Sequence, residues 1–256
     1  MHKIKIQHLS LQLFRYIISV IILLAMWTIF VRIFNIKPFI LPEPTSVISI
    51  LFTESNRFLG ATFVTLRNVV FGAICGISLG ITVGLLLAYS KKVRWIVEPY
   101  LTIFQSFPRE ALFPLFVVWF GFGITTKVIN ATLLSFLPMA MITLAATTNV
   151  RKDYIELIKT WGADKRQEFL HCRLPSAIPQ IIAGVKIAVP LALIGAVLAE
   201  FMGGNDGLGY IIISSGSTFN INRLFGAVII LAFTGLLILG IINSITSRLF
   251  RRYFSE

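Results

Sequence analysis

The chain has 256 residues, of which 56% are hydrophobic and only 13% are charged, and its formal net charge is +12. A soluble domain carries about 25% charged residues, so this composition excludes an ordinary water-soluble fold and a disordered chain alike. The length suits one membrane domain over residues 1–256, and membrane orientation explains the basic excess more simply than nucleic-acid binding does. We therefore expect a single all-α polytopic domain.

Runs without charged residues locate the expected spans. Four such runs hold 16, 23, 23 and 24 residues, at 16–31, 68–90, 128–150 and 224–247. A spanning helix needs about 20 residues. Two further apolar stretches, about 95–126 and 178–199, carry interior charges. Together they predict six transmembrane helices, of which the first is an uncleaved helix because no small-residue cleavage site follows it.

Lysine and arginine predict the orientation. With six spans both termini lie on one side, which would hold 15 of the 23 cations; two lie within spans, and six fall on the other side. Those six are Arg32, Lys37, Arg57, Arg67, Lys127 and Arg223. Because cytoplasmic loops are enriched in Lys and Arg, we expect both termini and the segments 91–94 and 150–178 in the cytoplasm of a bacterium, with the domain in its inner membrane.

A glycine every fourth residue marks one face of the second expected span. These residues are Gly72, Gly76, Gly80 and Gly84. Small residues let another helix approach closely in lipid, so the pattern predicts close helix packing, with a pore-lining face as the alternative. The spacing alone leaves open whether the neighbouring helix belongs to the same subunit or to another.

The third expected span is interrupted by Pro99, Pro108 and Pro114. Arg109 and Glu110 fall in its middle, and Lys186 lies about two turns into the fifth span. Ionisable groups at membrane depth are costly and mark candidate pathway residues. The alternatives are ion pairs with other helices, a third span that begins later along the chain, and for Lys186 a long stem that reaches the interface.

The outer end of the fifth span carries Glu200, which we interpret as an interfacial carboxylate. A glycine-rich turn at 203–209 follows it and lacks the spacing of a dinucleotide-binding loop. The sequence also lacks a P-loop, and its three histidines and two cysteines form no metal-binding pattern. No chemistry of its own is therefore predicted, and an integral membrane enzyme is disfavoured.

The segment 150–178 is the longest expected cytoplasmic connection and is predicted to form two short helices. Its first helix has one apolar face, made of Tyr154, Ile155, Leu157, Ile158 and Trp161. Gly162 suits a helix end, and Asp164 with Gln167 suits a capping box. Pro175 and Pro179 are expected to close the second helix and start the next span. An apolar element that projects from the membrane favours a protein partner, with packing against its own subunit as the alternative.

This segment resembles the E-A-A-x-x-x-G signature of binding-protein-dependent ABC importer permeases. Glu156 and Gly162 match it, Leu174-Pro175 match its end, and Leu157, Ile158 and Cys172 depart from it without changing the spacing. Leu41-Pro42, Pro108-x-x-Ala111-x-x-Pro114, Trp119-Phe120-Gly121 and Gly207-Leu208-Gly209-Tyr210 are similar to the nitrate, alkanesulfonate and taurine permeases.

The resemblance implies a type I ABC importer permease fold, a homodimer in lipid, and two cytoplasmic ATPase subunits that hold the ATP and Mg²⁺, so that this chain needs no cofactor. It also implies an extracytoplasmic substrate-binding protein. The ATPase-coupling residues would be Glu156, Leu157, Ile158, Gly162, Ala163, Leu174 and Pro175.

Substrates in such families include nitrate, sulfonates, taurine and pyrimidine vitamin precursors. The rival hypothesis is an ion- or proton-coupled secondary transporter that uses Arg109, Glu110 and Lys186; such folds usually show internal repeats, and no convincing repeat is present.

Overall fold

The structure is a computed structural model that describes the backbone of residues 2–249 and the side chains of residues 14, 15 and 18–248. Lys3, Lys5, Arg251 and Arg252, four of the fifteen cations that predict the orientation, have side chains outside this part. The elements are α1 (His2–Ile33), α2 (Pro44–Thr53), α3 (Ser55–Tyr89), α4 (Lys91–Ser106), η1 (Arg109–Leu112), α5 (Phe113–Phe120), α6 (Ile124–Thr148), α7 (Lys152–Thr160), α8 (Lys165–Glu168), η2 (Phe169–Arg173), α9 (Leu174–Gly203), α10 (Leu208–Ser217) and α11 (Ile221–Leu249).

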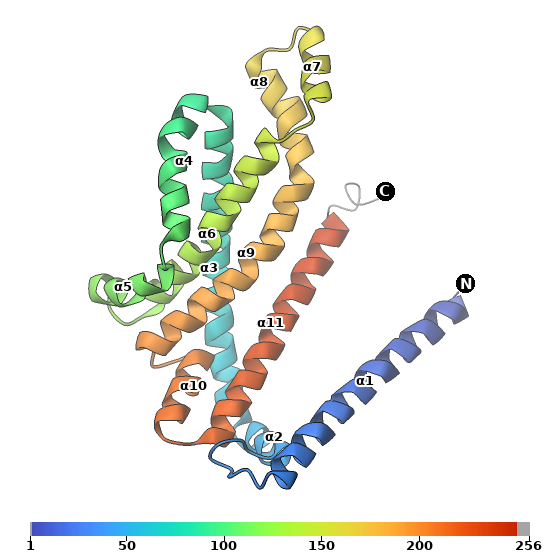
Figure 1. The fold of residues 1–256 in the computed structure, drawn as a ribbon, viewed down its shortest axis with the longest axis vertical. Coiled ribbons are helices and arrows are strands. Elements are labelled where there is room, and N and C mark those ends of the chain that lie inside the picture. Colours follow the sequence, from blue (N-terminus) through green and yellow to red (C-terminus); the bar gives the residue numbers. More distant parts are fainter. Residues whose placement is uncertain (1, 250–256) are drawn as a thin grey trace.

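Long helices form an elongated bundle with short helices at its two ends (Figure 1). Within the described residues, four helices are long and apolar enough to cross a membrane: Ser55–Tyr89, Ile124–Thr148, Lys165–Gly203 and Ile221–Arg248. The first expected span appears as the shorter apolar part Ile18–Ile33 of α1. The elements α7 and α8 stand at one end of the bundle, and α2 and α10 stand at the other (Figure 1).

The glycine face of α3 packs against α6 of the same chain. The two helices run in parallel, so Gly72, Gly76, Gly80 and Gly84 face in turn Ala131, Ser135, Met139 and Thr143. A Cβ atom built on Gly80 would lie 2.6 Å from the Cβ of Met139, and one built on Gly84 would lie 2.6 Å from that of Thr143. The backbones are therefore close enough to exclude any side chain from this face. The spacing alone left open whether the neighbouring helix belongs to the same subunit or to another. The structure shows that this face packs within one subunit.

On its other side α6 packs against α9, again through a small residue. A Cβ atom on Gly195 of α9 would lie 2.7 Å from the carbonyl oxygen of Asn130. Val69, Ala131, Val189, Ala192 and Ala196 form a buried core where the three helices meet. The centre of the bundle thus consists of α3, α6 and α9, and it is built from small and β-branched residues that permit close approach.

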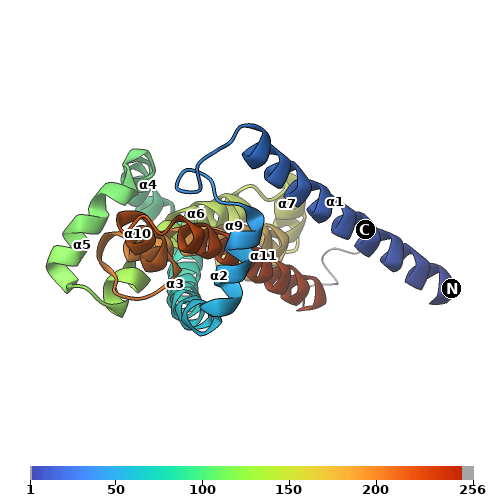
Figure 2. The same ribbon diagram turned by 90° about the horizontal axis from the view of Figure 1, so that it is seen from below.

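The third expected span is interrupted, as its prolines predict, but only Pro108 breaks it: Pro99 lies inside α4 and Pro114 in the first turn of α5. The helix α4 ends at Ser106, Pro108 has an extended backbone, and the single turn η1 precedes α5. A proline removes one backbone donor and disfavours helix at the residue before it, which accounts for the break at Phe107-Pro108. Beyond the break, α5 turns aside from the bundle (Figures 1 and 2).

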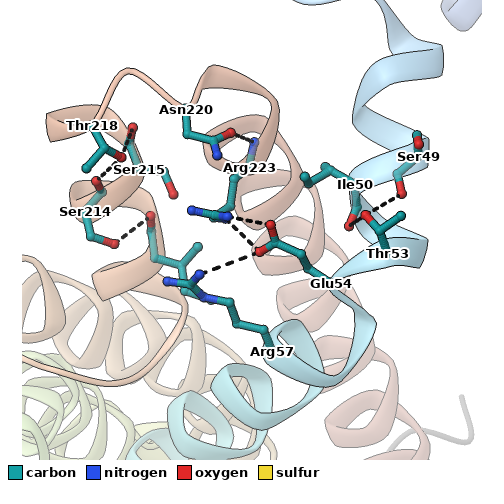
Figure 3. Close-up of polar contacts among 11 residues, drawn as sticks. Ser49, Ile50, Thr53, Glu54, Arg57, Ser214, Ser215, Thr218, Asn220 and Arg223 are labelled. Carbon is teal, nitrogen blue, oxygen red and sulfur yellow. Dashed lines mark hydrogen bonds and ion pairs between the residues drawn. The ribbon is translucent and has the colours of Figure 1, made fainter.

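The corner between α2 and α3 is fastened to the start of α11 by charged groups (Figure 3). Arg223 Nε donates to Glu54 Oε2 at 2.7 Å, and Arg57 Nη1 lies 3.7 Å from the same oxygen. The hydrogen bond from Arg223 lowers the pKa of the Glu54 carboxyl group. In contrast, α1 meets the bundle mainly near its C-terminal end, where the rings of Trp27 and Phe225 lie 5.9 Å apart, and the rest of α1 splays away (Figures 1 and 2).

Candidate functional site: the α7–α8 element and the Glu200 cluster

The turn between α7 and α8 has the backbone that the sequence predicts. Gly162 has φ +77°, a conformation that costs a non-glycine residue about 1–2 kcal/mol. Its N–H donates to the Lys159 carbonyl at 2.9 Å, and the Ala163 N–H donates to the Ile158 carbonyl at 3.3 Å. This pair of bonds is a Schellman motif, which satisfies the last carbonyls of the helix. Gly162 therefore ends α7 and fixes the direction of the chain after it.

A capping box starts α8, as predicted. The Gln167 N–H donates to Asp164 Oδ1 at 2.7 Å, and the Asp164 N–H donates to Gln167 Oε1 at 2.9 Å. The two side chains satisfy two backbone donors of the first turn reciprocally. Both ends of the short α7–α8 connection are thus fixed by local hydrogen bonds.

The second predicted short helix does not end at Pro175, and this expectation was wrong. The chain continues without interruption from α8 through the π-turn η2 into α9, as one apolar helix of 39 residues, Lys165–Gly203. In the π-turn the Leu174 N–H donates to the Phe169 carbonyl, five residues back. Pro175 falls in the first turn of α9, where a missing N–H is tolerated. Leu174 and Pro175 are half-buried at this junction.

Charged and aromatic contacts anchor the element to the ends of the long helices. Glu168, only 9% exposed, accepts from Arg173 Nε at 2.7 Å, and Arg173 also donates to the Thr147 carbonyl at the end of α6, at 3.4 Å. The ring of Phe169 meets that of Tyr89 edge-on, with centroids 5.1 Å apart. A displacement of α8 would therefore disturb direct contacts with the ends of α3 and α6.

The predicted apolar face of α7 is present, and its residues differ in how far they are exposed to solvent. Ile155 and Ile158 are half-buried. Tyr154, Leu157 and Trp161 are 49%, 51% and 79% exposed. Because they are three and four residues apart, these three side chains share one side of the helix. An exposed aromatic and aliphatic patch at the tip of a bundle is typical of a surface that another protein covers.

Glu156 lies on α7 and is exposed, and no ion pair involving it is found in the part of the chain that the structure describes. Ala163 is half-buried beside Gly162. The structure thus gathers five of the predicted coupling residues at one tip, on α7 and the turn after it, whereas Leu174 and Pro175 lie at the start of α9.

The three candidate pathway charges lie on two separate elements. Arg109 is half-buried in η1, and its Nη1 is buried without a hydrogen-bond partner among the described residues. Glu110 follows it in the same turn and is exposed. Lys186 is half-buried on α9. The break between α4 and α5 therefore presents a cationic group at an irregular piece of backbone.

Glu200 was expected to be an interfacial carboxylate, and this expectation was wrong because its side chain is 1% exposed. Its carboxylate accepts from Thr65 Oγ1 at 2.9 Å and from Asn68 Nδ2 at 3.2 Å, both on α3. It also accepts from the Gly209 N–H at 2.9 Å. Three donors from two segments thus hold one buried carboxylate at the α10 end of the bundle, which we call the Glu200 cluster.

The glycine-rich turn after α9 wraps around this carboxylate. A side chain at Gly207 would overlap the Glu200 carboxylate, and a Cβ atom on Gly209 would lie 2.8 Å from the Glu200 Cβ. The Leu208 N–H donates to Thr65 Oγ1 at 2.9 Å. The proximity of a helix-terminal carboxylate and a glycine-rich turn was the available signal in the sequence. The sequence could not show that Thr65 and Asn68 of α3 lie beside the Glu200 carboxylate.

Lys127, one of the six cations expected on the side opposite the termini, lies in the first turn of α6 and is buried. Its side chain is 4% exposed and forms an ion pair with Asp206. Its Nζ also donates to the Asp206 carbonyl at 3.2 Å. This pair ties the first turn of α6 to the glycine-rich turn, so Glu200, Lys127 and Asp206 together fix the connection between α9 and α10.

Comparison with known proteins agrees with this architecture. Residues 76–255 match the family of binding-protein-dependent transport system inner membrane components. The chain is 31% identical to a probable ABC transporter permease protein of Haemophilus influenzae, over 87% of this chain and 91% of that protein. It is 36% identical to the formylaminopyrimidine transport permease protein of Halalkalibacterium halodurans, over 85% and 87%.

Solved structures show the same fold. A chain of the MetNI methionine ABC transporter, in an inward-facing conformation, superposes with a TM-score of 0.66 at 20% identity, over 78% of this chain and 97% of that one. The chain therefore belongs to the binding-protein-dependent inner membrane component family, and it is a multi-pass ABC importer permease subunit with the type I fold. Members of this class are transport components and not catalysts.

Proposed function

We propose that this permease forms a translocation pathway as a homodimer and that α7 and the turn after it dock on two separate ATPase subunits, which bind ATP and Mg²⁺. The exposed patch of Tyr154, Leu157 and Trp161 at the tip of the bundle supports this proposal most strongly. Glu156, exposed on the same helix, would pair with a basic group of the ATPase. An ion-coupled secondary transporter is disfavoured because the chain belongs to the ABC permease family.

The coupling proposal predicts the effect of Gly162→Val. No atom lies within 4 Å of a Cβ built at this position, but φ is +77°, so the substitution acts through the backbone alone. We expect ATPase co-purification and substrate-stimulated ATP hydrolysis in liposomes to fall several-fold, while the membrane helices still insert. Gly162→Asn should behave nearly as wild type, because asparagine tolerates this conformation.

Glu156→Lys should weaken ATPase docking through charge reversal, in the same assay. The control is Asp153→Lys, which makes the same charge change one turn earlier in α7, at a residue already paired with Arg151 at 2.9 Å. If Gly162→Val and Glu156→Lys both retain wild-type docking and stimulated hydrolysis, α7 is not the coupling element.

We propose that the α7–α8 end and both termini lie in the cytoplasm and that the domain lies in a bacterial inner membrane. The excess of Lys and Arg on that side supports it. An alkaline phosphatase fused at Asn205 should be exported and active, whereas one fused at Lys165 should be inactive. The opposite pattern of activities would reverse the orientation and remove the coupling proposal with it.

Arg109 is proposed to line or gate the pathway, with Glu110 and Lys186 as further candidates. The support is its place at the break between α4 and α5, with one buried nitrogen lacking a hydrogen-bond partner in the described part of the chain. Arg109→Gln should reduce transport while assembly stays near normal. Full transport by this variant would refute the proposal, and misassembly would indicate a structural ion pair instead.

The substrate is proposed to be a small solute delivered by an extracytoplasmic binding protein. Relatives are named for formylaminopyrimidine, at 36% identity, and for taurine and aliphatic sulfonates, at 29% and 27%. A pyrimidine vitamin precursor is therefore the first substrate to test, followed by sulfonates and nitrate. Calorimetry of the cognate binding protein with each compound would decide among them.

A further inference from the structure

A cavity of about 400 Å³ opens between the corner that joins α3 to α4 and the α7–α8 element. Its wall contains five cations and one carboxylate: Lys91, Arg94, Lys159, Lys165, Arg173 and Glu168. Tyr89 and Phe169, the aromatic pair described above, form part of the apolar wall. The cavity is therefore strongly basic, and it is formed by segments that are far apart in sequence.

The carboxylates at the cavity leave much of this positive charge unmatched. Glu168 is shared by Arg173 at 2.7 Å and Lys159 at 3.7 Å, and Glu98, one turn further along α4, pairs with Arg94 at 2.7 Å. Five cations thus face two carboxylates. Lys165 lies 5.5 Å from the centre of the Tyr89 ring, and Lys91 has no ion pair in the described part of the chain. These two lysines are the groups best placed to take an added anion.

The cavity lies at the ends of two long apolar helices. Tyr89 is the last residue of the long apolar helix α3, and Lys165 is the first of the 39-residue apolar helix. Trp95 and Tyr100 on α4 are 82% and 62% exposed, and such residues gather at the headgroup level of bilayers. An apolar groove of about 810 Å³ runs along this helix and includes Trp95, Tyr100 and Glu98, the partner of Arg94.

We propose that this cavity binds the phosphate group of an anionic phospholipid, with its acyl chains along the exposed apolar side of α4. Basic pockets between transmembrane helices at the cytoplasmic surface suit such headgroups, and charge-assisted hydrogen bonds to phosphate oxygens are strong. The exposed Trp95 and Tyr100 on the same helix as Lys91 and Arg94 favour a diacyl lipid over free phosphate. The lipid would bridge α4 to the α7–α8 element and hold their relative position.

The test uses the purified permease without its ATPase, so that its outcome is independent of the coupling proposal. Native mass spectrometry counts retained lipids after equal exposure to phosphatidylglycerol and phosphatidylcholine. The variant K91Q/K165Q removes two cavity cations, and the control K92Q/R166Q removes two exposed neighbours that do not line the cavity. We expect wild type and control to retain phosphatidylglycerol selectively, and K91Q/K165Q to lose that selectivity several-fold.

Equal retention of the two lipids by wild type would overturn the proposal, as would equal losses in the two double variants, which would indicate general surface attraction. Displacement of phosphatidylglycerol by millimolar inorganic phosphate would identify the ligand as a free anion and also overturn it. A second measurement adds the ATPase to delipidated permease in neutral detergent. If K91Q/K165Q loses ATPase binding there and K92Q/R166Q does not, the cavity is a partner contact and not a lipid site.

Discussion

Gly72→Ala should destabilise the permease, although it adds only one methyl group. The new Cβ would overlap the Cβ of Ala131 on α6 and would lie 3.2 Å from two backbone atoms of the same residue. Two backbones in contact cannot yield as a side chain can, and overpacking of this kind costs about 1–3 kcal/mol. We expect a lower thermal unfolding midpoint and less monodisperse protein after extraction in mild detergent.

A second substitution makes this expectation sharper. Ala131→Gly removes the atom that the new methyl group meets, and the helical glycine that it adds offsets the one that Gly72→Ala removes, so the double variant should recover most of the loss. Gly60→Ala is the control, since nothing lies within 4 Å of a Cβ there, on the same helix. Equal stabilities for Gly72→Ala and Gly60→Ala would show that the parallel α3–α6 contact is wrong.

Glu200→Ala should have the largest effect of any single carboxylate substitution. It leaves the Thr65 hydroxyl, the Asn68 amide and the Gly209 N–H without their acceptor in a fully buried site. Each buried donor left unsatisfied costs about 1–3 kcal/mol. We expect failure of the α9–α10 connection to form, seen as proteolytic cleavage within residues 203–209 and a strong loss of folded protein.

The conservative and control variants separate a polar role from simple packing. Glu200→Gln keeps an oxygen acceptor and nearly the same volume, so it should retain much more folded protein than Glu200→Ala. Glu43→Ala removes a carboxylate that is still 35% exposed and whose partner Arg32, at 3.2 Å, is 66% exposed, and it should change the unfolding midpoint little. Similar midpoints for Glu200→Ala and Glu43→Ala would contradict the cluster described here.

The features that the sequence predicted are those set by local chemistry. Charge-free runs placed the long helices, because lipid tolerates few charges over about 20 residues. Gly162 and the Asp164–Gln167 pair identified a turn and a helix start, because their hydrogen bonds close within a few residues. These patterns need no knowledge of the rest of the fold.

The features that the sequence did not predict depend on distant partners. The sequence assigns Lys127 only to one side of the membrane, and its burial against Asp206, 79 residues later, appears only in the fold. Glu200 likewise reads as interfacial until Thr65 and Asn68 are placed opposite. Pro108 predicted a break in the third span, but the direction in which α5 leaves that break depends on its packing against the rest of the bundle.

The uninterrupted helix Lys165–Gly203 has a mechanical consequence. Its 39 residues make a rod of about 58 Å, at about 1.5 Å per residue, with the α7–α8 element at one end and the Glu200 cluster near the other. A tilt of about 5° about one end would displace the far end of such a rod by about 5 Å. The rod can bend at the π-turn η2, near its Lys165 end, and at Pro179 and Pro190 inside α9. Any movement at its Lys165 end must therefore either reach the turn around Glu200 or be absorbed at one of these three points.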